Sequence, residues 1–315
     1  MWFKHAYLFK IVEGLPASAE EFQAGLVERV LQPCPASAPA SLGWVSPFGK
    51  ESEVLVHSCG AYWLFGLGKE ERLLPATIVR EEVKQRILDI EQKFGRRVYG
   101  KEKAALRDDV QFELLSKAFV RRKQMWACLD HKAQLLILNV GADAKADEVT
   151  SFLHEHTPLR VESLEIKADL NQLLTRWVLN QEAPGNFGLA EDCVMADLEK
   201  ELGRVRFLNQ DLTAHDILEV AKTNRKVIEL GLGWRDRIKF RLGSVNTGKA
   251  QGNLPVLKHI KFLDVIKEQQ QEETLESIQQ QIDSDFAIMS HELAALLKEL
   301  FYRQVCVNQI APPLL

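Results

Sequence analysis

The chain has 315 residues, of which 46% are hydrophobic and 27% are charged, and its formal net charge at pH 7 is −4. This length exceeds one average domain, so we expect two or three hydrophobic cores, and the composition excludes a disordered or fibrous protein. No apolar run approaches the roughly 20 residues that cross a bilayer and the first residues lack the pattern of a signal peptide, so we expect a cytosolic protein without a membrane partner.

The first fifty residues predict a strand, a helix and a loop. The aromatic and β-branched run over 2–12 predicts the strand. A helix over 18–31 follows, with Ser18 as its N-cap and Glu21 at the capping-box spacing. Four prolines between residues 32 and 49 predict a loop, because proline cannot donate to a strand ladder.

A β-hairpin and a helical hairpin are predicted next. Residues 54–57 and 61–66 read as two strands separated by a short turn. After Pro75, two long charged segments over 77–94 and 101–119 predict helices that are joined by a glycine-containing turn. An αα-hairpin is therefore expected.

Strands and helices continue as far as a proline-glycine pair at 184–185. Residues 124–129 and 134–140 predict two strands, and residues 143–156 and 169–180 predict two helices. The pair at 184–185 is the best candidate for a domain boundary.

Short strands dominate the last third of the chain. A helix over 213–223 is expected to begin at Thr213 as its N-cap, and the polar run over 269–273 predicts a helix or a linker. The predicted strands cover 205–208, 227–232, 237–242 and 256–262. A final amphipathic helix over 290–301 places four leucines on one stripe. These are Leu293, Leu296, Leu297 and Leu300.

The order of these elements predicts an α+β fold with mixed or antiparallel sheets and packed helices. We expect three parts. Residues 1–75 together with 124–183 form an N-terminal β-α core, residues 76–123 form a helical hairpin insertion, and residues 184–315 form a C-terminal α+β region.

The cysteines and the glycine-rich segments give little sign of catalysis. Five cysteines lie far apart without a C-x-x-C pair, so neither a disulfide framework nor a zinc site is expected. We expect no metal, no cofactor and no catalytic residue. Gly243 to Lys249 matches the G-x-x-x-x-G-K phosphate loop, but Ala250 stands where a hydroxyl should bind magnesium and Pro255 follows where a helix is needed. A nucleotide-dependent enzyme stays open as an alternative.

The distribution of charge favours nucleic acid more than the net charge does. Residues 80–123 hold 13 Lys and Arg against 8 Asp and Glu, and residues 204–261 hold 12 against 5. A local surplus of positive charge attracts phosphates, because phosphate contacts need only positive groups along a surface. The surplus could equally cover solvated helix faces or a surface that binds other proteins, so a scaffold protein is the second alternative.

The candidate DNA-binding residues come from four basic clusters. They are Arg96 and Arg97; Arg121, Arg122 and Lys123; Lys222, Arg225 and Lys226; and Arg235, Arg237 and Lys239. In the last cluster the odd positions 235 to 241 would share one strand face, with cations at intervals of about 6.6 Å. No zinc finger spacing or recognition-helix pattern is present, which favours binding without base readout.

Along nearly its whole length the chain resembles the RdgC family of recombination-associated proteins. The segments that carry the resemblance are LGWVSP at 42–47, KEE at 69–71, LP at 74–75, AF at 118–119, LTRWV at 174–178, QDLT at 210–213, WRDRIKF at 234–240, DSDFAIM at 283–289 and ELA at 292–294.

The resemblance implies a ring-shaped homodimer with a basic central hole. Such a ring would bind duplex DNA independently of sequence, would antagonise the recombinase RecA by occupying its substrate, and would associate with the nucleoid in the cytoplasm without catalysis. It places Gln210 near a projecting finger of the C-terminal region and makes Phe119 the candidate dimer contact. Binding to single-stranded DNA stays open.

Overall fold

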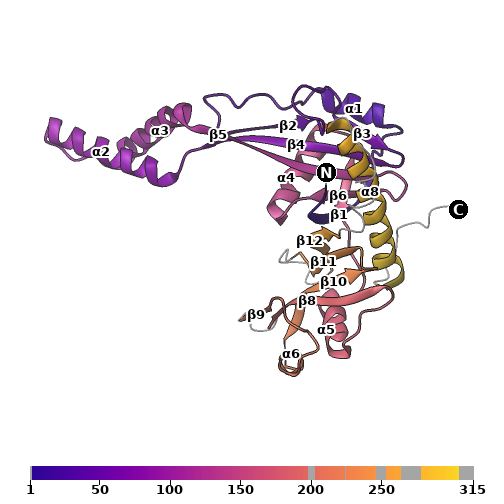
Figure 1. The fold of residues 1–315 in the computed structure, drawn as a ribbon. Coiled ribbons are helices and arrows are strands. Elements are labelled where there is room, and N and C mark those ends of the chain that lie inside the picture. The colour runs from indigo at the N-terminus through magenta and orange to yellow at the C-terminus, as the bar shows by residue number, and fades with distance from the viewer. Residues whose placement is uncertain (1, 198–202, 224, 246–252, 264–277, 305–315) are drawn as a thin grey trace. The chain divides into compact units, whose positions relative to one another are not determined.

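The computed structural model describes residues 2–197, 203–223, 225–245, 253–263 and 278–304 (Figure 1). The chain forms two compact units. The larger unit comprises Met1–Leu26, Ser46–Phe65 and Met125–Leu315, and the smaller unit comprises Val27–Val45 and Gly66–Gln124. Each unit has its own hydrophobic cluster, as the length of the chain predicts. The predicted division into three parts stays a prediction.

The larger unit is built on an antiparallel sheet in which neighbouring strands follow the order β5-β6-β1-β12-β11-β10-β8-β9. The bounds of these strands are β1 His5–Glu13, β5 Phe119–Asp130, β6 Leu135–Asn139, β8 Phe187–Ala196, β9 Arg204–Phe207, β10 Lys226–Trp234, β11 Ile238–Ser244 and β12 Pro255–Phe262. Two short strands pair outside this order: β7, Arg160–Ser163, pairs with β1, and β3, Val56–Cys59, pairs with the start of β4, Tyr62–Leu73. The predicted hairpin over 54–66 is confirmed, whereas β7 is missing from the sequence prediction.

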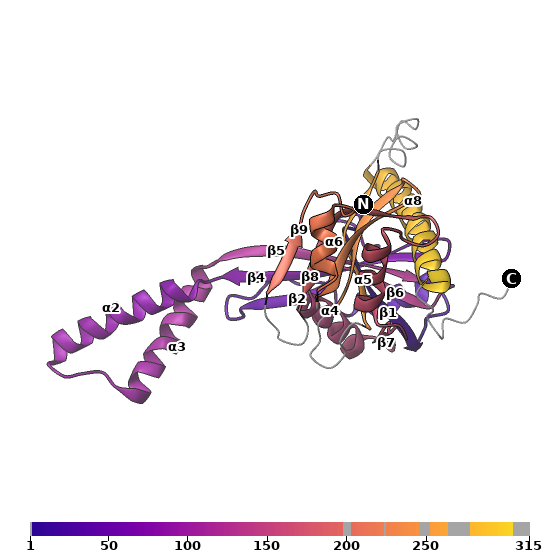
Figure 2. The same cartoon turned by 90° about the horizontal axis from the view of Figure 1, so that it is seen from below.

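The described helices of this unit are α1 Ala19–Val27, α4 Asp143–His156, α5 Leu170–Asn180, α6 His215–Ala221 and α8 Ile278–Lys298, which continues into the π-helix η1 Glu299–Gln304. Figure 2 labels α4, α5, α6 and α8. Alternate residues of β11 are buried because strand side chains point to opposite faces: Ile238, Phe240 and Leu242 lie in the core and Lys239 is exposed. The four predicted leucines of α8 and η1 are at most 5% exposed in the same core. The predicted amphipathic stripe is confirmed. Among the described residues, no helix is both long and apolar enough to cross a membrane.

The smaller unit contains the predicted helical hairpin, which is confirmed. α2, Ala76–Phe94, ends at Gly95 in the left-handed conformation (φ 62°), and α3, Gly100–Lys117, returns beside it (Figure 1). Val79, Val83 and Val110 are buried between the two helices.

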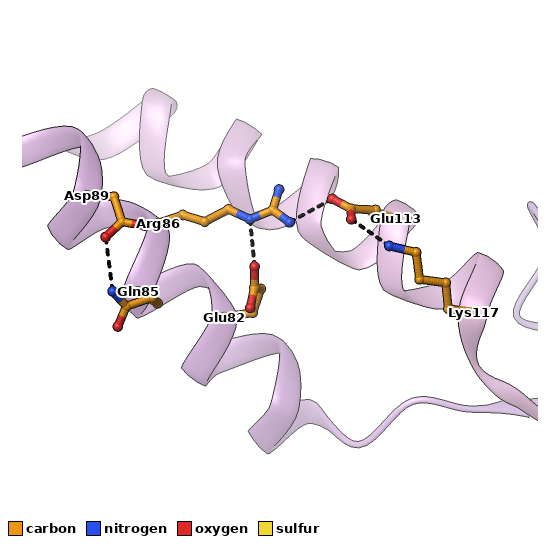
Figure 3. A network of polar contacts seen from close by, with 6 residues as sticks. All are labelled: Glu82, Gln85, Arg86, Asp89, Glu113 and Lys117. Carbon is orange, nitrogen blue, oxygen red and sulfur yellow. Dashed lines mark hydrogen bonds and ion pairs between the residues drawn. The ribbon is translucent and has the colours of Figure 1, made fainter. Parts of the chain in front are cut away.

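Charged side chains also bridge the two helices of this hairpin. Arg86 donates to Glu82 of its own helix at 2.8 Å and to Glu113 of α3 at 2.6 Å, and Lys117 pairs with Glu113 at 2.9 Å (Figure 3). Hydrogen bonds from Lys117 and Arg86 lower the pKa of Glu113 to about 2. These pairs are largely exposed, so they orient the helices more than they stabilise them.

One arginine fastens the base of the hairpin. The Arg72 guanidinium of β4 donates to five backbone carbonyls in two segments. The acceptors are the carbonyls of Cys34, Pro35, Leu115, Ser116 and Ala118, at 3.0 to 3.4 Å. Because the last carbonyls of a helix have no partners within the helix, Arg72 satisfies the end of α3 and holds it to the loop around Cys34.

The loop predicted over 32–49 is wrong in part, because it contains the strand β2, Ala40–Val45. The prolines lie outside this strand, and β2 pairs with β4 through Gly43 opposite Gly68. The backbone of Trp44 also binds the segment before it: its N–H donates to the Arg29 carbonyl, and its carbonyl accepts from the Leu31 N–H. That pairing ends α1 at Val27 and not at residue 31 as predicted.

Local hydrogen bonds confirm one further expectation about a helix start and correct another. Ser18 does cap α1, where its hydroxyl accepts from the Glu21 N–H at 3.2 Å. Thr213 does not cap α6, because its N–H and its hydroxyl both donate to Asp211 and the helix begins after Ala214. The polar run over 269–273 lies outside the described residues.

Candidate nucleic-acid interface

The first basic cluster lies on the turn between α2 and α3. The Arg96 guanidinium binds Glu102 through two hydrogen bonds of 2.7 Å each, so its charge is matched locally. Arg97 is exposed, and no carboxylate pairs with it among the described residues. Of the two predicted residues, Arg97 is therefore the one that is free to bind a phosphate.

The second cluster opens β5 and is largely neutralised by β4. Arg121 and Lys123 point to one side of the strand and share Glu71, at 2.8 Å from Arg121 Nε and 2.8 Å from Lys123 Nζ. Arg122 lies 4.0 Å from Glu70. Hydrogen bonds from Lys123 and Arg121 lower the pKa of Glu71 to about 2. Its carboxylate therefore stays charged, and holds both cations, until the pH falls well below 4.

The third cluster surrounds the end of α6. Lys222 pairs with Glu219 at 2.7 Å. Arg225 is partly buried, and its Nε has no hydrogen-bond partner among the described residues. Lys226 begins β10. Gln210 is exposed just after β9, where its N–H donates to the Glu191 carbonyl at 2.9 Å.

The fourth cluster is a turn and not the continuous strand face that we predicted. Arg235 and Asp236 adopt φ values of 50° and 52°, and the Arg237 N–H donates to the Trp234 carbonyl at 2.9 Å. Positive φ at both central residues favours the twist of a hairpin, and three residues connect Trp234 of β10 to its ladder partner Ile238 of β11. Since β11 begins at Ile238, only Lys239 and Arg241 of the four odd positions lie in the strand.

The arginines of this cluster are bound by carboxylates that are distant in sequence. Arg235 stacks 4.7 Å from the Trp234 ring centre and pairs with Glu299 at 2.8 Å. Arg237 donates to Glu292 from Nε at 3.1 Å, and Arg241 pairs with Asp192 at 2.9 Å. Lys239 is exposed and has no such partner among the described residues. The arginines here support the fold, and Lys239 is left to face solvent.

Glu299 is the buried centre of these contacts. It is 6% exposed and accepts hydrogen bonds from Asn186 Nδ2 at 2.7 Å, Trp234 Nε1 at 3.1 Å and Arg235 at 2.8 Å. Burial raises the pKa of Glu299, but the hydrogen bonds from Trp234 and Asn186 outweigh burial and keep the pKa below its ordinary value. Glu299 therefore stays ionised and fixes the turn between β10 and β11.

Lys258 and Lys261 of β12 are two further cations that were not among the predicted DNA-binding residues. Lys261 lies directly opposite Lys239, and Lys258 directly opposite Arg241. Between these two pairs, two residues of β12, His259 and Ile260, lie opposite the single residue Phe240 of β11, because His259 adopts a left-handed conformation (φ 51°) and forms a bulge. Strict alternation would place residues 258 and 261 on opposite faces of the sheet. The periodicity of the sequence therefore does not reveal that these two lysines lie on the same face.

The phosphate-loop alternative receives no support from the described part of its segment. Gly243 lies inside β11 opposite Val256 and does not open a loop after the strand. A Cβ at Gly243 would lie 2.9 Å from the Ile228 carbonyl oxygen, so close packing between strands accounts for this glycine. Lys249 lies outside the described residues.

Phe119 is the first residue of β5, not the end of α3 as predicted, and its side chain is 85% exposed. Val120 beside it is 47% exposed. No group of three or more His, Cys, Asp and Glu side chains that could hold a metal ion occurs in the part of the chain that the structure describes.

Comparisons with known proteins agree over nearly the whole chain. Residues 1–303 match the protein-family model described as "Putative exonuclease, RdgC". The chain is 32% identical over 291 residues to the recombination-associated protein RdgC of Pseudomonas fluorescens strain Pf0-1, and the aligned residues cover 92% of each chain. It is 31% identical over 303 residues to the proteins of the same name from Pseudomonas syringae pv. tomato and Pseudomonas aeruginosa strain LESB58, with 96% of each chain covered.

Proposed function

Because this chain belongs to the RdgC family of recombination-associated proteins, we propose that it binds duplex DNA without reading its sequence, as a homodimer that closes around the duplex. Occupation of the DNA then limits recombination by RecA, which needs the same DNA. In this proposal binding is the whole activity, and the protein works in the cytoplasm at the nucleoid without a cofactor.

The exposed cations that no described carboxylate neutralises carry this proposal. Arg97 lies on a turn, and Lys239 and Lys261 lie on strands. Cations on turns and sheet surfaces reach phosphates, which carry no sequence information, whereas base readout requires an element that enters a groove. The proposed binding is therefore electrostatic, salt-dependent and similar for every sequence.

Dimerisation adds residence time to this weak, distributed attraction. A closed ring must open before the duplex can leave, so many modest contacts suffice for slow release. We propose Phe119 as the dimer contact, because an aromatic side chain that is 85% exposed gains most when a partner covers it. Gln210 and the remaining predicted basic residues are proposed to lie along the DNA.

The proposal is tested by titrating the purified protein against two unrelated duplexes of equal length at low and moderate salt, with its mass in solution measured alongside. We expect a dimer, equal affinity for both duplexes, and a steep loss of affinity with salt. A single strand of the same length and a sample with Mg²⁺ complete the set. Sequence-dependent affinity, a monomer, or shortening of the DNA in Mg²⁺ would contradict the proposal.

Replacing Glu71 by glutamine should strengthen DNA binding. The carboxylate of Glu71 holds Arg121 and Lys123, so its loss leaves two cations free for phosphates, and we expect a gain of about tenfold at low salt. Glu51→Gln is the matched control, because Glu51 is exposed in the turn before β3 and holds no cation among the described residues. Equal gains in both variants would mean that affinity follows net charge alone and that Arg121 and Lys123 do not touch DNA.

A further inference from the structure

Lys239 and Lys261 form a pair of like charges on neighbouring strands. They lie directly opposite each other on β11 and β12, and both are exposed. Like charges in this position destabilise an antiparallel sheet. Among the described residues, no carboxylate lies within ion-pair distance of either ammonium group.

The next cationic pair along the same two strands has carboxylate partners. Arg241 and Lys258 are also directly opposite, but Asp192 binds Arg241 at 2.9 Å and Glu229 lies 3.4 Å from Arg241 and 3.9 Å from Lys258. The protein therefore supplies carboxylates to one cross-strand pair and, in its described part, none to the pair beside it. No described residue therefore supplies a compensating negative charge to Lys239 and Lys261, and an anion bound at this surface would.

The surroundings of this pair add further positive groups. His259 and Lys4 are exposed, and the ring of His5 lies 5.7 Å from that of His259 in an edge-on contact. Burial lowers the pKa of His5, and the positive charges of His259, Lys258 and Lys4 lower it further. The positive groups on the neighbouring strands β1 and β12 thus disfavour a further positive charge at His5 and favour the approach of an anion.

On the other side of Lys239 the sheet surface carries no side chains at two successive positions. Gly233 of β10 lies directly opposite Lys239, and Gly188 of β8 lies directly opposite Gly233. Directly opposite residues share a face, so both glycines lie on the face of the lysines. A Cβ at either glycine would meet nothing within 4 Å, so neither internal packing nor a left-handed φ requires glycine there. Glycine at such strand positions allows another backbone to approach closely.

We propose that Lys239 and Lys261 form a phosphate-binding site for the sugar-phosphate backbone of DNA, with Gly233 and Gly188 as the flat surface on which that backbone lies. We call these four residues the lysine-glycine strip. Side chains at directly opposite positions are about 5 Å apart at Cβ, so the two ammonium groups can bind the same phosphate or two consecutive ones. This inference rests on the proposed function and assigns it a place on the sheet.

Lys239→Glu separates binding from folding. The substitution turns a like-charge pair into an ion pair with Lys261, so thermal stability should stay the same or rise. DNA affinity at low salt should fall about tenfold or more, and the slope of log affinity against log salt should become shallower by about one. Lys50→Glu is the control, because it changes the net charge equally at an exposed turn of the same unit.

Gly233→Val tests the flat surface without changing charge. Valine suits a strand and has open space here, so the fold should be kept while affinity for every duplex falls severalfold. Gly25→Ala in α1, where a Cβ also meets nothing within 4 Å, should leave affinity unchanged.

The outcomes distinguish this inference from the proposed function. If the unaltered protein binds duplexes but Lys239→Glu binds as well as Lys50→Glu, or Gly233→Val as well as Gly25→Ala, the strip is not the site and the proposed function still stands. If the unaltered protein binds no duplex at low salt, the proposed function fails and the strip fails with it.

Discussion

Replacing Phe119 by alanine is expected to convert the proposed dimer into monomers while leaving the stability of the chain unchanged. The side chain is 85% exposed, so its removal opens no cavity and loses little burial. In a dimer the same ring would leave water almost completely, and central aromatic residues of this kind contribute about 2 kcal/mol or more to an interface. The dimer dissociation constant should therefore rise roughly thirtyfold or more.

Sedimentation equilibrium over a range of protein concentrations measures this change, and thermal denaturation verifies the fold. Phe112→Ala is the matched control, because Phe112 is 64% exposed on α3 of the same unit. Below the new dissociation constant, DNA should also be released faster, because a monomer cannot enclose it. An unchanged dissociation constant would show that Phe119 does not lie in the interface. A loss of thermal stability would show that Phe119 belongs to the chain's own core.

Replacing Glu299 by alanine should destabilise the larger unit by about 1 to 3 kcal/mol, the cost of leaving a buried hydrogen-bond donor without its acceptor. Arg235 is 48% exposed, so the lost ion pair adds little to this cost. The substitution leaves the buried indole N–H of Trp234 without an acceptor and removes the ion-pair partner of Arg235. Urea denaturation measures the loss. Glu292→Ala, which removes the partner of Arg237, should cost less, because the carboxylate of Glu292 is more exposed than that of Glu299 and accepts no hydrogen bond from a buried tryptophan. A loss below about 1 kcal/mol for Glu299→Ala would show that the turn holds without the carboxylate.

The same residue predicts how stability depends on pH. The pKa of Glu299 is lower in the folded chain than its ordinary value, so the folded state binds the proton less readily than the unfolded state does. Its contribution is complete above the ordinary pKa and is lost as the pH falls through the folded pKa. Glu299→Gln should flatten this part of the acid denaturation curve.

Elements that depend on nearby residues could be predicted from the sequence. The helical hairpin follows from Pro75, from Gly95 and from two charged helical segments, and the leucine stripe of α8 follows from its 3.6-residue period. The strand β2 could not be predicted, because prolines surround it and its ladder partner lies in β4. The bulge at His259 leaves no periodic signal either.

The candidate site shows the same limit more sharply. The sequence identifies basic clusters but not which of their charges are already matched. Glu71 lies 50 residues from Arg121, and Glu299 lies 64 residues from Arg235. Only folding brings these carboxylates to their arginines, so the free cations could not be told from the structural ones in advance.

The five carbonyls held by Arg72 give the smaller unit a mechanical property. Phe119 directly follows Ala118, whose carbonyl Arg72 binds, and the end of α3 and the Cys34 loop are tied to the same guanidinium. A force applied at Phe119 is therefore transmitted first to the side chain of Arg72, which is hydrogen-bonded to both segments. In the proposed dimer, the force that separates the protomers would depend on whether the contact of Phe119 or the hydrogen bonds of Arg72 break first.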